Sequence, residues 1–124
     1  MRRVGMGLLT ALFLGSCGGT AAVSTITVDL FEWGVGVSSS SLNAGPVTVS
    51  MVNAGNFDHT LVITAIDGRA IAAGALLSAG DGAQMTVHLD PGTYEFTCRI
   101  VIATDGGLSD HYSNGMVSVV RVGK

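Results

Sequence analysis

A cysteine, a histidine and a methionine follow one another near the C-terminus of the sequence, at Cys98, His111 and Met116. Thiolate and thioether sulfur are soft donors that hold Cu(I), and imidazole nitrogen binds copper in either oxidation state. Two imidazoles, a thiolate and a weak axial thioether therefore suit copper in both states. The C-terminal stretch supplies three of these four donors. His59 is the candidate for the second imidazole.

The histidine and cysteine candidates lie inside longer motifs. Residues 53–59 read Asn-Ala-Gly-Asn-Phe-Asp-His and fit the pattern N-x-G-x-x-x-H. Residues 91–98 read Pro-Gly-Thr-Tyr-Glu-Phe-Thr-Cys and fit P-G-x-Y-x-F-x-C. In these motifs and in their order the chain resembles the cupredoxins, the family of plastocyanin and azurin. The resemblance covers nearly all of the chain after residue 16 and implies one copper ion, bound by His59, Cys98, His111 and Met116.

Each of the four residues has a plainer interpretation when it is considered alone. A histidine at the start of a strand is more often exposed or hydrogen-bonded than bound to a metal. A lone cysteine is more often a small buried hydrophobe, and a methionine that opens an apolar strand is more often part of the core. All four residues occur in family order, each in its matching context, and this joint pattern favours a copper site.

One spacing departs from the family pattern. Twelve residues, 99–110, separate Cys98 from His111, where cupredoxins usually have only a few. The segment begins with an apolar run that favours an extended conformation and then contains a turn signal, so it is predicted to leave the site and return to it. It would open the site to solvent, displace Met116 or provide a contact for a partner. The sequence leaves these three alternatives open.

The surroundings of the site are also predicted. His111 lies in the C-terminal loop and His59 at the start of a strand beneath it, so His111 is expected to be the more exposed imidazole, through which electrons enter. Thr60 and Asn56 are expected to form hydrogen bonds to the loops that orient the ligands. His88 falls on the polar side of a strand and is placed outside the site.

The sequence begins with features of an export signal. Arg2 and Arg3 precede an apolar run that is too short to span a bilayer comfortably. Leu-Gly-Ser-Cys at 14–17 then resembles the bacterial lipoprotein signal, in which the cysteine becomes the lipidated first residue of the mature protein. Acyl chains on Cys17 would tether the protein to the periplasmic or extracytoplasmic face of a membrane. The alternative is ordinary signal cleavage beside an incidental cysteine.

These features divide the chain into a signal peptide at 1–16, a tether at 17–24 and a cupredoxin-like domain at 25–124. If Cys17 is lipidated, Cys98 is the only thiol left in an exported domain. No disulfide can then form within the chain, and metal ligation gives the unpaired thiol a role.

Composition and hydropathy pattern predict the fold class. The chain has 124 residues, of which 48% are hydrophobic and 12% charged, and this allows one domain. Segments with the pattern of strands lie at 25–30, 47–51, 59–63, 85–89, 94–98 and 116–122. The prediction is an all-β Greek-key β-sandwich of about seven or eight strands. The alanine-rich segment at 70–79 is predicted to form a short helical turn.

Two functions agree with these residues. The first is an exported, membrane-tethered type 1 copper protein that carries one electron to or from a redox partner protein. The second is a copper-binding protein that stores copper or delivers it to an accepting protein. In a third, metal-free interpretation the four motif residues would coincide by chance in an adhesive or structural sandwich. The net charge of −3 gives no basis for a nucleic-acid partner, and no constellation of catalytic residues indicates an enzyme.

Overall fold

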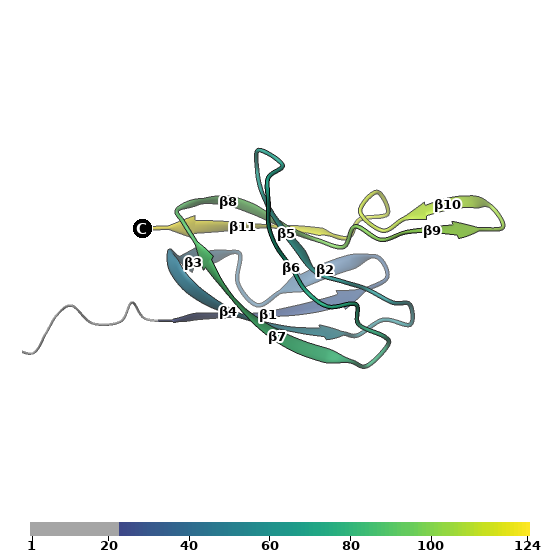
Figure 1. The fold of residues 1–124 in the computed structure, drawn as a ribbon, viewed down its shortest axis with the longest axis horizontal. Coiled ribbons are helices and arrows are strands. Elements are labelled where there is room, and N and C mark those ends of the chain that lie inside the picture. The colour runs from purple at the N-terminus through teal and green to yellow at the C-terminus, as the bar shows by residue number, and fades with distance from the viewer. Residues whose placement is uncertain (1–22) are drawn as a thin grey trace, which may run out of the picture.

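The computed structural model describes residues 23–124, which form two packed β-sheets and a projecting hairpin (Figure 1). One sheet has the strand order β2-β1-β4-β7, and the other has the order β3-β11-β8-β5-β6. The strands are β1 Ser24–Phe31, β2 Gly34–Val37, β3 Ser41–Asn43, β4 Gly45–Asn53, β5 Val62–Ala65, β6 Ala70–Ala73, β7 Gly82–Leu89, β8 Gly92–Thr97, β9 Val101–Thr104, β10 Gly107–Asp110 and β11 Val117–Gly123. The predicted all-β sandwich is confirmed.

The two sheets enclose a hydrophobic core. Residues of β4 alternate between buried and half-buried along the strand, so Val47, Val49 and Met51 face inward as predicted. In the other sheet, Phe96 of β8 is fully buried and is among the largest side chains of the core. Cys98 directly follows β8 and is fully buried as well.

Parallel pairing of β1 with β4 brings two loops together that are distant in the sequence. Leu30 is the register partner of Asn53, and Ala54 N donates a hydrogen bond to Leu30 O (2.8 Å). The turn after β1 therefore lies against the loop after β4. Glu32 lies in that turn and His59 at the end of that loop.

Strands β9 and β10 form an antiparallel hairpin that extends beyond one end of the sandwich (Figure 1). The hairpin is closed at its base, where His111 N donates a hydrogen bond to Ile100 O (2.9 Å). All residues of β9 are exposed. The segment between Cys98 and His111 thus leaves the sandwich and returns to it, as its sequence predicts.

Two details differ from the prediction. Residues 23–124 contain eleven strands rather than seven or eight, because β2, β3, β6, β9 and β10 have only three or four residues each and give little hydropathy pattern. The helical turn predicted at 70–79 is wrong, because Ala70–Ala73 is the edge strand β6, paired with β5. Pairing with the sheet outweighs the helix propensity of alanine here.

The signal peptide predicted at 1–16 and nearly all of the tether predicted at 17–24 lie outside the described residues. The first strand begins at Ser24, one residue before the predicted start of the domain. Within residues 23–124 no helix has the length and hydrophobicity needed to cross a bilayer.

Candidate metal centre

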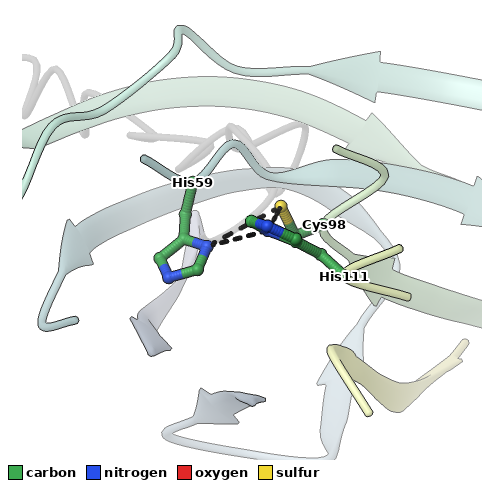
Figure 2. A group of neighbouring side chains, drawn as sticks. All are labelled: His59, Cys98 and His111. Atoms are coloured by element: carbon green, nitrogen blue, oxygen red, sulfur yellow. Dashed lines mark hydrogen bonds between the residues drawn. The ribbon is translucent and has the colours of Figure 1, made fainter. Parts of the chain in front are cut away.

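Two imidazoles and a thiol meet in the interior, close to the base of the hairpin (Figure 2). His59 Nδ1, Cys98 Sγ and His111 Nδ1 all lie within 4.8 Å of one another, and the three residues are buried. The thiol sulfur is 3.4 Å from His111 Nδ1 and 3.9 Å from His59 Nδ1, and the two nitrogens are 3.3 Å apart. Three of the four predicted ligands are therefore brought together through atoms that bind metals.

Met116, the fourth predicted ligand, is fully buried beside this cluster. Its backbone N donates a hydrogen bond to His111 O (3.0 Å), and its backbone O accepts one from Cys98 N (3.2 Å). The preceding residue, Gly115, has a φ of 122°, a conformation that a residue with a side chain rarely adopts. The turn that ends at Gly115 thus holds Met116 next to both Cys98 and His111.

The backbone of His59 is fixed by a β-bridge to Leu77, in which each N donates to the other residue's O (3.0 and 2.8 Å). Asn53 shapes the loop before it. The Nδ2 of Asn53 donates to Phe57 O (2.7 Å) and Leu77 O (2.9 Å), and its Oδ1 accepts from Gly55 N (2.9 Å). The motif asparagine and glycine of residues 53–59 therefore act by closing the loop that presents His59.

Glu32 is the residue of this site that sequence reasoning missed. Its Oε1 lies 2.7 Å from His59 Nε2 (Glu32 is not drawn in Figure 2). Phe57 N and Asn56 N donate hydrogen bonds to the same carboxylate (2.9 and 3.0 Å). Burial alone would raise the pKa of Glu32, but the hydrogen bonds from Phe57, Asn56 and His59 outweigh it and lower that pKa from 4.5 to about 2. Glu32 is therefore ionised at neutral pH.

An ionised carboxylate only accepts hydrogen bonds, so this network assigns the proton of the neutral His59 ring to Nε2. The lone pair of Nδ1 then faces Cys98 and His111. This is the tautomer that a metal ligand requires when it binds through Nδ1.

The predicted exposure of His111 is not found, because both imidazoles are buried. His111 is 1% exposed and His59 is 0% exposed. The ring of Trp33 meets His111 edge-on, with ring centroids 4.9 Å apart, and Phe57 stacks on Trp33 at 6.1 Å. Burial lowers the pKa of His111, and the neighbouring His59 lowers it further, so the neutral form that binds metals is favoured.

The other predicted neighbours have smaller roles. Thr60 Oγ1 donates a hydrogen bond to Gly74 O (3.0 Å), in agreement with the prediction that it ties a loop. Asn56 contributes through its backbone N, which binds Glu32. His88 is exposed, lies 3.2 Å from Asp90 and takes no part in the cluster.

Several solved structures share this arrangement of strands. Reduced auracyanin from Roseiflexus castenholzii is 20% identical, with a TM-score of 0.57 over 86% of this chain and 100% of that chain. Auracyanin A, a "blue" copper protein from Chloroflexus aurantiacus, is 16% identical, with a TM-score of 0.59 over 82% of this chain and 99% of that chain. Reduced rusticyanin is 17% identical, with a TM-score of 0.63 over 85% of this chain and 82% of that chain. The chain has the cupredoxin fold.

No family sequence model matches the chain, and no curated protein matches it in sequence. The similarity to the solved structures therefore establishes the cupredoxin fold, while the metal centre depends on its own geometry. Its donors are two imidazole nitrogens and a thiol sulfur, a set that suits copper. The carboxylate of Glu32 is hydrogen-bonded to the far nitrogen of His59 and adds no oxygen donor to the cluster.

Proposed function

We propose that this protein is a type 1 copper protein that carries one electron at a time between partner proteins. In this proposal His59 and His111 bind the ion through Nδ1, Cys98 through its sulfur and Met116 through its thioether. The supporting observation is that both Nδ1 atoms and the thiol sulfur lie within 4.8 Å of one another in a buried site. Copper bound by two imidazoles, a thiolate and a weak thioether alternates between Cu(I) and Cu(II), and so carries one electron.

The chain around the donors suits a retained ion. His59 is fixed by its bridge to Leu77, and Cys98 and His111 are both hydrogen-bonded to the backbone of Met116. Ligands held in this way change position little when the charge at the site changes. Coordination removes the thiol proton, so Cys98 would serve as a thiolate.

Electrons have to cross the residues that cover His111, because neither imidazole is exposed. Trp33, which contacts His111, is 38% exposed, and its stacking partner Phe57 is 52% exposed. We place electron entry at this aromatic pair instead of at the imidazole edge that the sequence indicated. Phe57 and Ile102 of the hairpin line the same pocket. The hairpin has exposed apolar side chains, which suit contact with a redox partner protein.

We also propose that the domain is exported and is tethered to the extracytoplasmic face of a membrane through acyl chains on Cys17. This proposal depends on the sequence of residues 1–17. The function proposed for the domain is electron transfer without catalysis of a chemical reaction.

Copper storage or delivery is the second candidate, and the observation in its favour is the long segment between Cys98 and His111. An exposed thiolate would let copper pass to an acceptor. The segment instead forms a hairpin directed away from the sandwich, and Cys98 is fully buried. This burial supports the electron carrier.

The visible spectrum of the copper-loaded protein tests the proposal. The oxidised protein is expected to hold one copper ion per chain and to show a strong thiolate-to-copper absorption. Cys98→Ser is expected to abolish the absorption, while Cys17→Ser, the matched cysteine control, retains it. A wild-type protein that binds no copper, or an absorption that persists in Cys98→Ser, would show that the site is wrongly assigned. Rapid loss of copper on reduction would favour delivery.

A further inference from the structure

The carboxylate of Glu32 is not one of the proposed copper ligands, but it binds the ring of the proposed ligand His59 on the side away from the cluster. Glu32 follows β1, and its carboxylate lies 2.7 Å from His59 Nε2 although 27 positions separate the two residues. Its side chain is 18% exposed and accepts hydrogen bonds from Asn56 N and Phe57 N. A Cβ atom at Gly55 would overlap the carboxylate, so the loop closes tightly around it.

The second imidazole has no equivalent partner. Nε2 of His111 is buried and has no hydrogen-bond partner among residues 23–124. The two rings therefore present the same atom to the cluster, but a charged group holds only the ring of His59.

We propose that Glu32 is a positioning residue, which keeps the His59 proton on Nε2 and places a negative charge behind the ring. This inference rests on the proposed copper function and deepens it. The first effect leaves the Nδ1 lone pair free to bind the ion. The second effect stabilises the more highly charged oxidation state, Cu(II), and so lowers the reduction potential.

Two substitutions separate the hydrogen bond from the charge. Glu32→Gln keeps an oxygen that accepts from His59 Nε2 and Phe57 N, but it removes the charge. Glu32→Ala removes both. Glu95→Gln is the matched control, because Glu95 is the only other glutamate in the sequence. Its carboxylate contacts Tyr112 and Arg99 and no imidazole.

The first measurement is the tautomer of His59 in the metal-free protein, read from nitrogen-15 chemical shifts at a pH where the ring is neutral. The wild-type protein and Glu32→Gln are expected to carry the proton on Nε2, and Glu32→Ala a mixture of tautomers. Copper affinity is expected to fall about 10- to 100-fold in Glu32→Ala. A residue that only supported the loop would lower stability without changing the tautomer.

The second measurement is the reduction potential of the copper-loaded protein. Glu32→Gln is expected to lower the ratio of Cu(II) to Cu(I) affinity about tenfold, which raises the potential by about 59 mV. Glu95→Gln is expected to keep the wild-type potential.

A wild-type His59 protonated on Nδ1 would overturn the inference, and so would a Glu32→Gln protein with the wild-type potential. If Glu32→Ala does not fold, the wild-type tautomer and the Glu32→Gln potential still decide the question. If the wild-type protein binds no copper, the proposed function fails. The tautomer then tests the positioning role by itself.

Discussion

His59 and His111 offer the same ring atom to the cluster but are held by different forces. Glu32 binds the far nitrogen of His59, whereas the buried far nitrogen of His111 has no hydrogen-bond partner in the described part of the chain. The ring of Trp33 packs edge-on against the imidazole of His111. A buried polar group without a partner costs about 1–3 kcal/mol. The orientation of His59 is therefore set by hydrogen bonds, and that of His111 by packing and by its neighbours in the cluster.

The buried thioether of Met116 acts either as an axial ligand of the copper ion or only as part of the hydrophobic core. Met116→Leu conserves volume and is expected to lower the free energy of unfolding by less than about 1.5 kcal/mol. Leucine replaces a dipolar side chain with an apolar one, and a more apolar site disfavours the more highly charged Cu(II) relative to Cu(I). The reduction potential is therefore expected to rise, by about 59 mV for each tenfold change in relative affinity.

Redox titration and chemical denaturation check this prediction, with Met85→Leu as the control. Met85 is a partly buried methionine of β7, packed against the core. A potential that is equal in Met116→Leu and the wild-type protein would assign Met116 to the core alone.

At this scale the sequence predicted the donors and missed what surrounds them. His59, Cys98 and His111 were identifiable because their types, motifs and order are visible along the chain. Glu32 was not, because its contact depends on the register between β1 and β4, and a carboxylate in a turn looks like any solubilising residue. Trp33 lies in the same turn after β1, so its contact with His111 also depends on tertiary structure. The sequence therefore did not reveal that Trp33 covers His111.

Among the elements, the hairpin of β9 and β10 leaves and rejoins the sandwich at one place. His111 N bonds to Ile100 O (2.9 Å), and the guanidinium of Arg99 lies 3.7 Å over the ring of Tyr112. The sequence predicted that residues 99–110 leave the site and return to it, but the direction in which the hairpin projects depends on these contacts at its base. Because the four candidate ligands are buried, the hairpin does not open the site to solvent. We propose that it provides a contact for a partner, and the Met116→Leu variant tests whether Met116 is displaced.

Removal of the hairpin tests how far the site depends on it. If Asn-Gly replaces residues 101–110, the hydrogen bond from His111 N to Ile100 O becomes the closing bond of a two-residue β-turn, so the base of the hairpin is expected to stay intact. The thiolate absorption and the retention of copper on reduction are expected to stay as in the wild-type protein. Electron exchange with a redox partner protein is expected to slow, because exposed apolar side chains of the hairpin are lost.

The control keeps the hairpin and changes only its exposed apolar surface, with Ile102→Ser and Leu108→Ser together. This variant should slow electron exchange as the shortened protein does. Faster release of copper from the shortened protein would mean that the hairpin closes the site.

Over the whole molecule, the start of β1 and the base of the hairpin, where the metal centre lies, are at opposite ends of the sandwich (Figure 1). β1 begins at the end of the sandwich away from the hairpin (Figure 1). The stretch from Cys17 to Ser24 spans at most about 25 Å when fully extended. A tether of this length would keep the domain near the membrane and leave the hairpin end free for partners.

Cell fractionation tests the anchor. The full-length protein is expected in the membrane fraction, and Cys17→Ala is expected to be released or misprocessed without a change in the visible spectrum of the folded domain. Mass spectrometry of the mature N-terminus identifies the modification. A soluble wild-type chain that begins at an unmodified residue would contradict the lipoprotein prediction.

The acid sensitivity of the metal-free fold follows from two groups at the centre. The pKa of His111 is lowered from 6.5, chiefly by burial. Burial opposes the shift at Glu32, but hydrogen bonds lower its pKa from 4.5 to about 2. In both cases the unfolded chain binds the proton more readily than the folded chain, so the stabilisation is present above the unfolded pKa and is lost as the pH falls toward the folded one.

The free energy of unfolding of the metal-free protein is therefore expected to decrease below about pH 6.5 and again below about pH 4.5. Urea denaturation at about pH 7.5, 5.5 and 4 measures both steps. His111→Gln is expected to flatten the first step and Glu32→Gln the second, because each variant removes one titrating group. If the metal-free protein were equally stable at the highest and lowest of these pH values, neither group could be held in the folded state as the structure shows.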